Sequence, residues 1–495
     1  MMFTSLTFGL FFAVVFFLYW FIFNRSVNLQ NLFLLVSSYT FYGWFNLNFL
    51  FLLIGLSILN YTLGSLIQKT SHSSYRKMFF IFGMVINIGT LFIFKYFAFF
   101  VDSFIQFIRL FGFSPDSFTV RLILPIGISF YIFLSISYII DVYQRRLIAV
   151  GNVVDILLSF SFFPIILAGP IQRPKSLLTQ IQKFRVFQYA AATDGLKQIL
   201  WGLFMKVVIA DNCVFPVNAI FKDFSLYTGS TLVLGVFLFS IQIYADFAGY
   251  SNMAIGIGKL LGFNIMKNFS YPYFSSNIRE FWKRWNISLT TWFRDYVFLP
   301  ASYSISRKIK PERICSIKTE YFIYSFGIFI TWTLTGLWHG ANFTFIIWGL
   351  IHGCSLVIYQ ISMKFRKRLL KKVQLRNDNT LILLFETGFT FCIVMIAWIF
   401  FKADSVNHAL RYISRIFSNS FFTLPQFDKL PDVIITLLLI SIFFIVEWFG
   451  RNQDYAIATI GMKWPKVFRW SMYCIVFLFV FWFSGEQQQF IYFQF

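Results

Sequence analysis

Two histidines stand in one apolar stretch, residues 334–353, whose sequence is LTGLWHGANFTFIIWGLIHG. The whole chain of 495 residues contains only four histidines. An ionisable side chain at membrane depth is costly and usually marks a functional site, and histidine is the side chain best suited to proton transfer near neutral pH. We therefore take His339 and His352 as candidates for acid–base chemistry inside a membrane.

The spacing of these two histidines limits what they can do together. His352 follows His339 by 13 residues, which along one unbroken helix is about 220° of rotation and roughly 20 Å of rise. This separation argues against a metal or proton-relay pair of the i, i+4 kind. We expect His352 to be a packed core histidine or a polar lining residue. His72 and His408 fall in predicted loops, where they would be solvated.

A second polar cluster lies on one predicted helix. Gln242, Asp246 and Tyr250 are spaced at i, i+4 and i+8, so they share one helix face. Asp246 is the only acidic residue in the apolar run of residues 230–250. An unpaired carboxylate there would be costly, so we expect either a polar chamber around it or a partner such as a Tyr, Arg or His.

A third cluster, residues 277–300, mixes basic and aromatic side chains in the sequence NIREFWKRWNISLTTWFRDYVFLP. Its basic residues include Arg279, Lys283, Arg284 and Arg294. Guanidinium and ammonium groups among tryptophans are suited to hold phosphate groups at the cytoplasmic interface. The plain alternative is headgroup contact by a basic amphipathic helix.

The composition identifies a polytopic membrane protein. Hydrophobic residues make up 58% of the chain and charged residues only 13%, which is too apolar for a soluble globular protein. The net charge of +22 would also suit a nucleic-acid binder, but the basic residues cluster between apolar runs, as cytoplasmic loops do. The five cysteines are scattered, so neither a disulfide framework nor a metal site is expected.

The apolar runs predict about twelve spans, most of them close to the length needed to cross ~30 Å of hydrocarbon. The first run is expected to stay on the mature protein, because no basic residue precedes it and it lacks a small-x-small cleavage site. The predicted spans are residues 6–23, 31–45, 49–67, 79–100, 122–142, 194–216, 230–250, 321–338, 341–361, 381–401, 433–449 and 470–484.

Three segments depart from a simple alternation of spans and loops. Residues 152–168 are apolar but flanked by basic segments and interrupted by proline, so we expect a re-entrant segment. Residues 251–318 mix charges with tryptophan and are expected to form amphipathic half-helices at the interface. Residues 321–361 form a hairpin between two basic segments, with His339 at its apex, nearer the outer face than the midplane. A hydrogen-bonded residue at a membrane turn is therefore the plain alternative to a catalytic His339.

Five blocks of sequence, in this order, closely resemble the membrane-bound O-acyltransferase family, and within it the membrane subunits of alginate O-acetyltransferases. The blocks are LPIGISFYIFLSISYIIDVY, SFFPIILAGPIQRP, QIYADFAGYSNMAIGIGKLLGF, REFWKRWNISLTTWFRDYVFLP and LTGLWHGANFTFIIWGLIHG. The resemblance is strong over residues 124–353 and extends to most of the chain through its length, its span pattern and the closing FIYFQF. Asn286 stands where the family commonly has His, and Asn252 where it has Asp. These departures weaken the case for a second base at 286 and for a charge at 252.

The resemblance implies an all-α, polytopic fold, a ring of about 11–12 tilted transmembrane helices with re-entrant and interfacial half-helices around a central tunnel. It implies one membrane domain over residues 1–495, with N-terminal helices at 1–121, a catalytic core at 122–361 and C-terminal helices at 362–495. It also implies that the arginine-rich block neighbours the donor.

The resemblance further implies that His339 is catalytic. Either His339 takes the proton of an acceptor hydroxyl that attacks the thioester of an acyl-CoA, or it is itself acylated as a relay. Asn342 is expected to orient the imidazole or the carbonyl. The other expected supporting and tunnel-lining residues are Trp338, His352, Asp246, Gln242, Tyr250 and Asn286.

The expected reaction moves an acetyl group from cytoplasmic acetyl-CoA to a hydroxyl of an exported polysaccharide, through a separate extracytoplasmic acyltransferase of the SGNH type. The protein is expected to be multi-pass in the inner membrane, in contact with membrane lipid, without bound cofactor, metal or nucleic acid. D-Alanyl transfer to teichoic acid is the alternative within the family. A glycan or lipid transporter or flippase, and a purely structural membrane subunit, are the alternatives from other classes.

Overall fold

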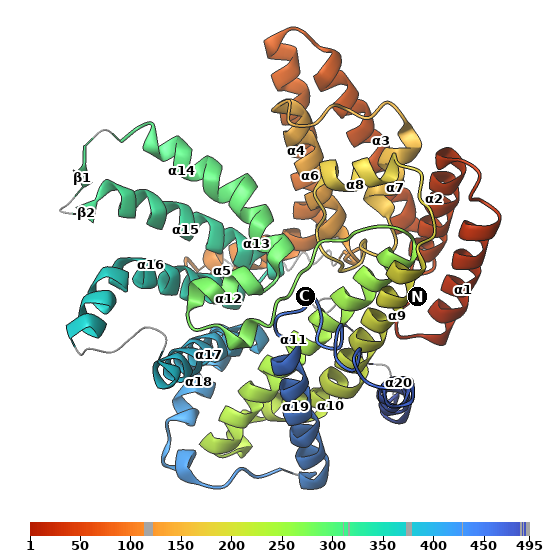
Figure 1. The fold of residues 1–495 in the computed structure, drawn as a ribbon. Helices are drawn as coiled ribbons and strands as arrows, with labels where there is room; N and C mark the ends of the chain where they lie inside the picture. The colour runs from red at the N-terminus through yellow and green to blue at the C-terminus, as the bar shows by residue number, and fades with distance from the viewer. Residues whose placement is uncertain are drawn as a thin grey trace. The chain divides into compact units, whose positions relative to one another are not determined.

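The computed structural model describes residues 1–112, 122–309, 311–314, 317–372, 379–427, 429–485, 488, 490 and 491. Nearly all regular structure in these residues is helical (Figure 1). The exception is a short antiparallel pairing of β1 (Arg313–Ile314) with β2 (Ile317–Lys318). The prediction of an all-α fold is confirmed.

Helices occur at all twelve predicted spans. Within the described part of the chain, seven helical stretches are long and apolar enough to cross a membrane. These are 47–69, 73–109, 189–222, 229–260, 343–366, 380–402 and 430–450. The chain is therefore a multi-pass membrane protein, while the number of crossings and the ring around a tunnel stay predictions.

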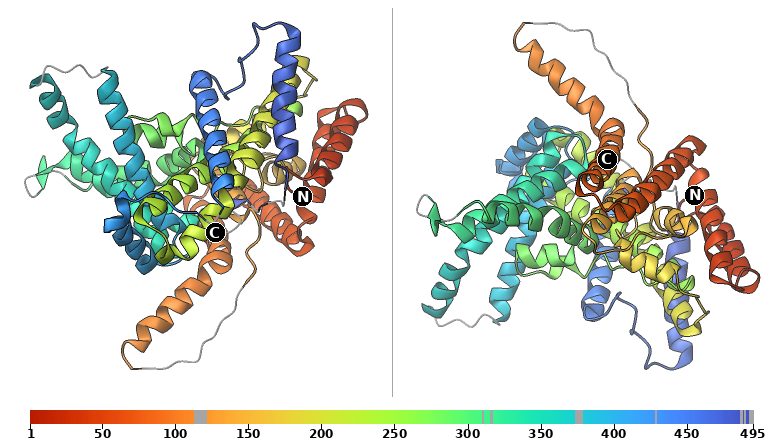
Figure 2. Two further views of the ribbon diagram at one scale, coloured as in Figure 1. Left: turned by 90° about the horizontal axis from the view of Figure 1, so that it is seen from below. Right: turned by 90° about the horizontal axis from the view of Figure 1, so that it is seen from above.

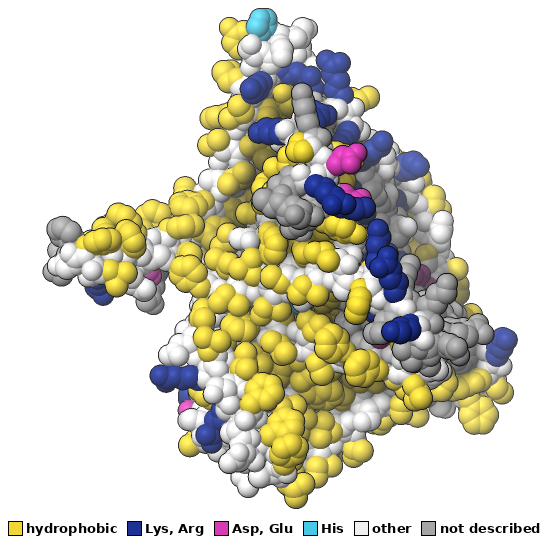
Figure 3. All heavy atoms as spheres, turned by 90° about the vertical axis from the view of Figure 1, so that its left-hand side faces the viewer, with side chains coloured by type: hydrophobic (Ala, Val, Ile, Leu, Met, Phe, Trp, Pro, Cys, Tyr) yellow, Lys and Arg dark blue, Asp and Glu magenta, His cyan; other side chains and the backbone are white. Residues whose placement is uncertain are grey.

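The exposed surface of many helices is apolar, which is the reverse of a soluble protein. Large hydrophobic side chains are exposed along α1 (Leu6–Phe21), α19 (Leu430–Gly450) and α20 (Lys466–Trp482). Hydrophobic side chains also cover much of the face in Figure 3, where Lys and Arg gather in separate clusters. Such a surface is expected where helices meet lipid.

The chain forms two compact units. The first consists of residues 1–199 and 250–266, and the second of residues 200–249 and 267–495. Two helices, α9 (Tyr189–Leu203) and α11 (Gly229–Leu260), contribute to both units. The subdivision at residues 121 and 361 stays a prediction.

The first unit is held by a buried arginine. Its other helices are α2 (Val27–Gly43), α3 (Leu47–Lys69), α4 (Ser73–Leu91), η1 (Phe92–Tyr96), α5 (Phe97–Arg109), α6 (Ile128–Tyr143), α7 (Val153–Ser161) and α8 (Pro174–Ile181). The Arg185 guanidinium donates to Tyr19 Oη and to Asn31 Oδ1, both at 2.6 Å. Asn31 Nδ2 in turn donates to Asp155 Oδ1 at 2.9 Å. This chain of hydrogen bonds joins α1, α2 and α7.

Helix α7 agrees with the expected re-entrant segment. It has nine residues, which climb only about 14 Å at ~1.5 Å per residue, less than the ~30 Å of a hydrocarbon core. The chain then turns through Phe162–Gly169, and the side chains of Phe162 and Phe163 are buried. Irregular backbone of this kind is covered by protein, as it must be at membrane depth.

The second unit holds the remaining helices. They are η2 (Phe204–Ala210), α10 (Asp211–Lys222), η3 (Phe224–Leu226), η4 (Pro272–Phe274), α12 (Ile278–Arg284), α13 (Ile287–Phe293), η5 (Arg294–Phe298), α14 (Leu299–Ser306), α15 (Thr319–His339), α16 (Phe343–Lys372), α17 (Thr380–Lys402), α18 (Val406–Ile416), η6 (Asn419–Phe422), α19 and α20.

Two boundaries in this region differ from the sequence prediction. The expected interfacial segment began at residue 251, but residues 251–260 continue α11 because the helix runs on without a break. His408 was expected in a loop, yet it lies in the amphipathic helix α18, which Ser405 caps by accepting a hydrogen bond from the His408 N–H. The short helices α12, α13 and α14 agree with the predicted half-helices.

Helices α15 and α16 form the predicted hairpin and run side by side (Figure 1, Figure 2). Glycines allow the two backbones to approach closely. A Cβ at Gly349 would overlap the carbonyl oxygen of Trp332, and one at Gly336 would overlap the carbonyl oxygen of Phe345. This close packing fixes the register in which the side chains of the two helices meet.

Candidate functional site

His339 is the last residue of α15, and its side chain is enclosed by aromatic rings. It is 5% exposed. Its ring centroid lies 4.8 Å from that of Trp338, 4.7 Å from Trp348 on α16 and 5.1 Å from Phe401 on α17. Three helices therefore hold the imidazole in a largely apolar setting.

The turn after His339 is fixed by Asn342. Asn342 Oδ1 accepts a hydrogen bond from the Thr344 N–H at 3.0 Å, which caps the start of α16. Its Nδ2 donates to the carbonyl oxygen of Asp404 at 2.9 Å. These two hydrogen bonds let Asn342 fix the turn that ends at α16. Its expected role in orienting the imidazole or the carbonyl stays a prediction.

His352 on α16 is fully buried, with 0% of its surface exposed. Its Nδ1 accepts a hydrogen bond from Trp282 Nε1 on α12 at 3.3 Å. Its ring centroid lies 4.8 Å from Trp282, 5.6 Å from Trp332 and 4.9 Å from Trp348.

The two histidines contact the same tryptophan. Because the Trp348 ring lies 4.7 Å from His339 and 4.9 Å from His352, the two imidazole centroids cannot be farther apart than these two distances together. The expected separation of roughly 20 Å along one helix is therefore wrong. α15 ends at His339 and α16 begins only at Phe343, so the chain reverses between the two histidines.

A cavity of about 410 Å³ lies next to the tryptophans that surround His352. Arg279, Lys283 and Arg294 line it, so the structure brings three of the four predicted donor-binding residues together. Arg284 is not among the lining residues and instead pairs with Glu280 at 2.6 Å. The spacing explains this difference, because Arg279 and Lys283 lie one helical turn apart on α12 and share a face.

The wall of this cavity contacts His352, whereas the three aromatic rings described around His339 lie outside its lining. Trp282 and Trp332 line the cavity, and both rings contact His352. In the sequence, Trp282 is one of several tryptophans in the basic block 277–300. Its hydrogen bond to His352 connects positions 70 residues apart, so nothing in the local pattern could have indicated it.

Asp246 has a partner of a kind that the sequence analysis did not anticipate. It is 2% exposed, and its Oδ1 lies 2.7 Å from Lys206 Nζ. Lys206 also pairs with Asp211 at 2.7 Å, and Asp246 Oδ2 accepts a hydrogen bond from the Ile491 N–H at 2.7 Å. The structure thus gives Asp246 a partner, as expected, but the partner is a lysine of the apolar span 194–216 in place of the Tyr, Arg or His named as examples.

The other members of the polar clusters are dispersed. Gln242 is buried one turn before Asp246, and its Oε1 has no hydrogen-bond partner among the described residues. Tyr250 belongs to the first unit and stacks on Phe3 at 4.7 Å. Asn286 is buried at the start of α13 with a φ of 41°, a left-handed conformation that Asn tolerates better than most residues.

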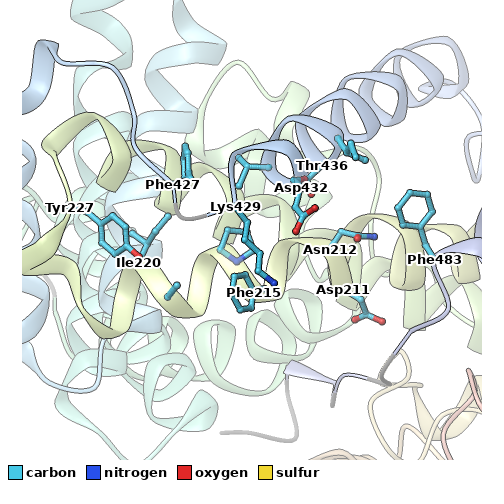
Figure 4. A pocket seen from close by; sticks show the side chains of 14 residues that line it. Asp211, Asn212, Phe215, Ile220, Tyr227, Phe427, Lys429, Asp432, Thr436 and Phe483 are labelled. Atoms are coloured by element: carbon cyan, nitrogen blue, oxygen red, sulfur yellow. Dashed lines mark hydrogen bonds between the residues drawn. The ribbon is translucent and has the colours of Figure 1, made fainter.

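A second cavity, of about 320 Å³, lies between α10 and the start of α19 (Figure 4). Asp211, Asn212, Lys429 and Asp432 give it a polar lining. Trp338, Trp348 and Phe401, whose rings surround His339, are not among its lining residues. Across the described ranges, no group of three or more His, Cys, Asp or Glu is arranged to hold a metal ion.

The sequence matches the family model described as MBOAT, membrane-bound O-acyltransferase family, over residues 151–403. It is 35% identical over 430 residues to a probable alginate O-acetylase of Pseudomonas aeruginosa, covering 86% of this chain and 77% of that protein. It is 28% identical over 517 residues to a peptidoglycan O-acetyltransferase of Helicobacter pylori, covering 94% of this chain and 91% of that protein. It is 31% identical over 252 residues to a teichoic acid D-alanyltransferase of Bacillus subtilis, covering 50% of this chain and 62% of that protein.

Proposed function

The chain belongs to the membrane-bound O-acyltransferase family, and on this basis we propose that it transfers an acetyl group from cytoplasmic acetyl-CoA to a hydroxyl group on the outer side of the inner membrane. The observation that carries this proposal is the enclosure of His339 beside His352, whose tryptophan neighbours line a basic cavity. Family membership favours an O-acyltransferase over the alternatives of a transporter or a purely structural subunit.

The basic cavity is the proposed site of the donor. Arg279, Lys283 and Arg294 are exposed at its lining and are suited to hold the phosphates of CoA. The tryptophans at its wall offer an apolar surface to the pantetheine arm. The basic segments at 307–318 and 364–376 favour a cytoplasmic location for the start of α15 and the end of α16, which is the side that acetyl-CoA reaches.

His339 is the proposed base. Its imidazole takes the proton of the acceptor hydroxyl while the hydroxyl oxygen attacks the thioester carbonyl, a role worth about 10²–10⁴-fold in rate. An acyl-histidine relay is the alternative path through the same residue. In both paths the surrounding rings exclude water, which protects the thioester from hydrolysis.

The proposed acceptor is an exported polysaccharide, because relatives of this chain are named for alginate and peptidoglycan. A cavity of about 410 Å³ has room for part of a ligand but not for a polymer. We therefore propose that a separate extracytoplasmic acyltransferase of the SGNH type passes the acetyl group to the polymer.

The test compares His339→Ala with His72→Ala, a histidine at the start of α4 outside the site. Each variant is reconstituted in lipid nanodiscs with radiolabelled acetyl-CoA and an envelope extract from the producing cells, and CoA release and label transfer are measured. His339→Ala should lose at least about a hundredfold in rate, while His72→Ala should keep it. Full transfer by a correctly inserted His339→Ala protein would contradict both catalytic paths.

D-Alanyl transfer to teichoic acid is a second candidate, because half of the chain is similar to a teichoic acid D-alanyltransferase. The two candidates differ in the donor. The same assay, run with a D-alanyl thioester of a carrier protein in place of acetyl-CoA, separates them. Turnover with the carrier thioester alone would favour D-alanyl transfer.

A further inference from the structure

His352 carries a buried nitrogen that the proposed base mechanism does not use. Its Nε2 has no hydrogen-bond partner among the described residues, although the whole side chain is shielded from solvent. A polar atom buried in this way costs free energy. The rings of His352 and His339 both contact Trp348, so a ligand group held near His339 would be placed to complete this hydrogen bonding.

The proton on His352 is placed by Trp282. An indole N–H can only donate a hydrogen bond, and Trp282 Nε1 donates to Nδ1 of His352 at 3.3 Å. Nδ1 must therefore be unprotonated, so a neutral imidazole carries its proton on Nε2. His352 is then a hydrogen-bond donor toward the interior and cannot serve as a second base.

Other groups in the same cluster also lack partners. The indole Nε1 atoms of Trp348 and Trp398 are buried without a hydrogen-bond partner in the described structure. These two rings are stacked with centroids 6.0 Å apart. All of these nitrogens are donors, which is the lining expected around an oxygen that gains negative charge.

We infer that His352 donates a hydrogen bond from Nε2 to the carbonyl oxygen of the acyl group while His339 acts as the base. This inference rests on the proposed function and assigns His352 a role within it. The acceptor hydroxyl oxygen forms a bond to the carbonyl carbon, and its proton moves to His339. The carbonyl electron pair moves onto the oxygen that His352 holds. When this electron pair re-forms the C=O bond, the C–S bond breaks and the leaving CoA thiolate takes the proton from His339.

The first test replaces His352 in the full chain and measures acetyl-CoA turnover. His352→Phe keeps a buried ring but lacks the donor, so kcat should fall by about 10²–10³-fold with little change in the KM for acetyl-CoA. His352→Gln retains an amide N–H near the place of Nε2 and should recover at least about tenfold of that loss. A wild-type kcat in His352→Phe would overturn the inference. Equal losses of kcat in well-folded His352→Phe and His352→Gln proteins would overturn it as well.

The second test needs no turnover, and its first reading uses the wild-type protein alone, so it remains decisive if a variant fails to fold. With only four histidines in the chain, selective 15N-histidine labelling allows the ring nitrogens of His352 to be assigned by NMR. The expected spectrum shows a protonated Nε2 and an unprotonated Nδ1. Trp282→Phe removes the donor to Nδ1 and should therefore change the ratio of the two neutral tautomers. Adding acetyl-CoA to the His339→Ala protein should move the Nε2 resonance. A proton on Nδ1 in the wild-type protein, or an Nε2 resonance that acetyl-CoA leaves unmoved, would overturn the inference.

The two proposals fail in different ways. If the wild-type protein neither binds nor turns over acetyl-CoA, the proposed function is wrong, whereas the tautomer of His352 can still be read. If the wild-type protein turns over acetyl-CoA, His339→Ala does not, and His352→Phe matches the wild type, only the role of His352 is wrong.

Discussion

His352 accepts a hydrogen bond from Trp282, whereas His339 ends α15 beside Trp348. Two side chains of one type therefore acquire different chemistry from their neighbours. A ring whose Nδ1 is occupied keeps its remaining proton for donation, and in the proposed mechanism the base role falls to His339. This division of roles follows from a contact between α12 and α16 and not from the pair of histidines alone.

The donor cavity permits a prediction with a control from the same helix. Arg279→Ala removes a charged lining residue and should raise the KM for acetyl-CoA about tenfold, because a hydrogen bond to a charged group contributes about 1.5–3 kcal/mol. Arg284→Ala removes a residue that pairs with Glu280 outside the lining and should leave this KM nearly unchanged. Steady-state kinetics on the two variants measure the difference. Equal changes in KM would show that the cavity does not hold the CoA phosphates.

How far the sequence predicts single residues depends on where their partners lie in the chain. Gln242 and Asp246 could be placed on one helix face, because helical spacing is local. The pairing of Asp246 with Lys206 could not be predicted, because it joins two different spans. The bond from Asn342 to the carbonyl oxygen of Asp404 could not be predicted either, because it joins positions 62 residues apart.

At the scale of elements, the α15–α16 hairpin keeps the two histidines together. The sequence predicts both helices from their apolar runs, and it predicts the hairpin from the basic segments on either side. It misses the proximity of the histidines because a rise of ~1.5 Å per residue applies only along one helix. The helix is interrupted between His339 and Phe343, so the two histidines lie on different helices and that rise does not separate them.

The glycines of this hairpin are a direct test of its packing. Gly349→Ala adds a Cβ against the carbonyl oxygen of Trp332, so α16 must move away from α15 and carry Trp348 with it. We expect a loss of about 1–3 kcal/mol in stability together with a loss of acetyl transfer. Gly388→Ala on α17 is the control, because a Cβ there meets nothing within 4 Å. Thermal unfolding in detergent and the acetyl-CoA assay measure both effects, and an active, stable Gly349→Ala protein would refute close packing as the reason for this glycine.

At the scale of the whole molecule, the chain returns to its first unit after a long excursion. The end of α11 packs with α1, where Tyr19 Oη donates to the carbonyl oxygen of Leu261 at 3.2 Å across 242 residues. The sequence predicts the helices that take part, because each is an apolar run. It does not predict which runs belong to one unit, because this depends on packing between segments far apart in the chain.

The Arg185 cluster should therefore control the stability of the first unit. Arg185→Met removes five hydrogen bonds, to Tyr19, to Asn31 and to three backbone carbonyl oxygens, at a cost of about 3 kcal/mol or more. Hydrogen exchange measured by mass spectrometry should then show lost protection in α1, α2 and α7. Protection in α15 and α16 should persist, since these helices belong to the second compact unit.

Lys175→Met, an exposed change on α8, is the control and should alter neither pattern. Uniform loss of protection along the chain would show instead that the two units unfold as one.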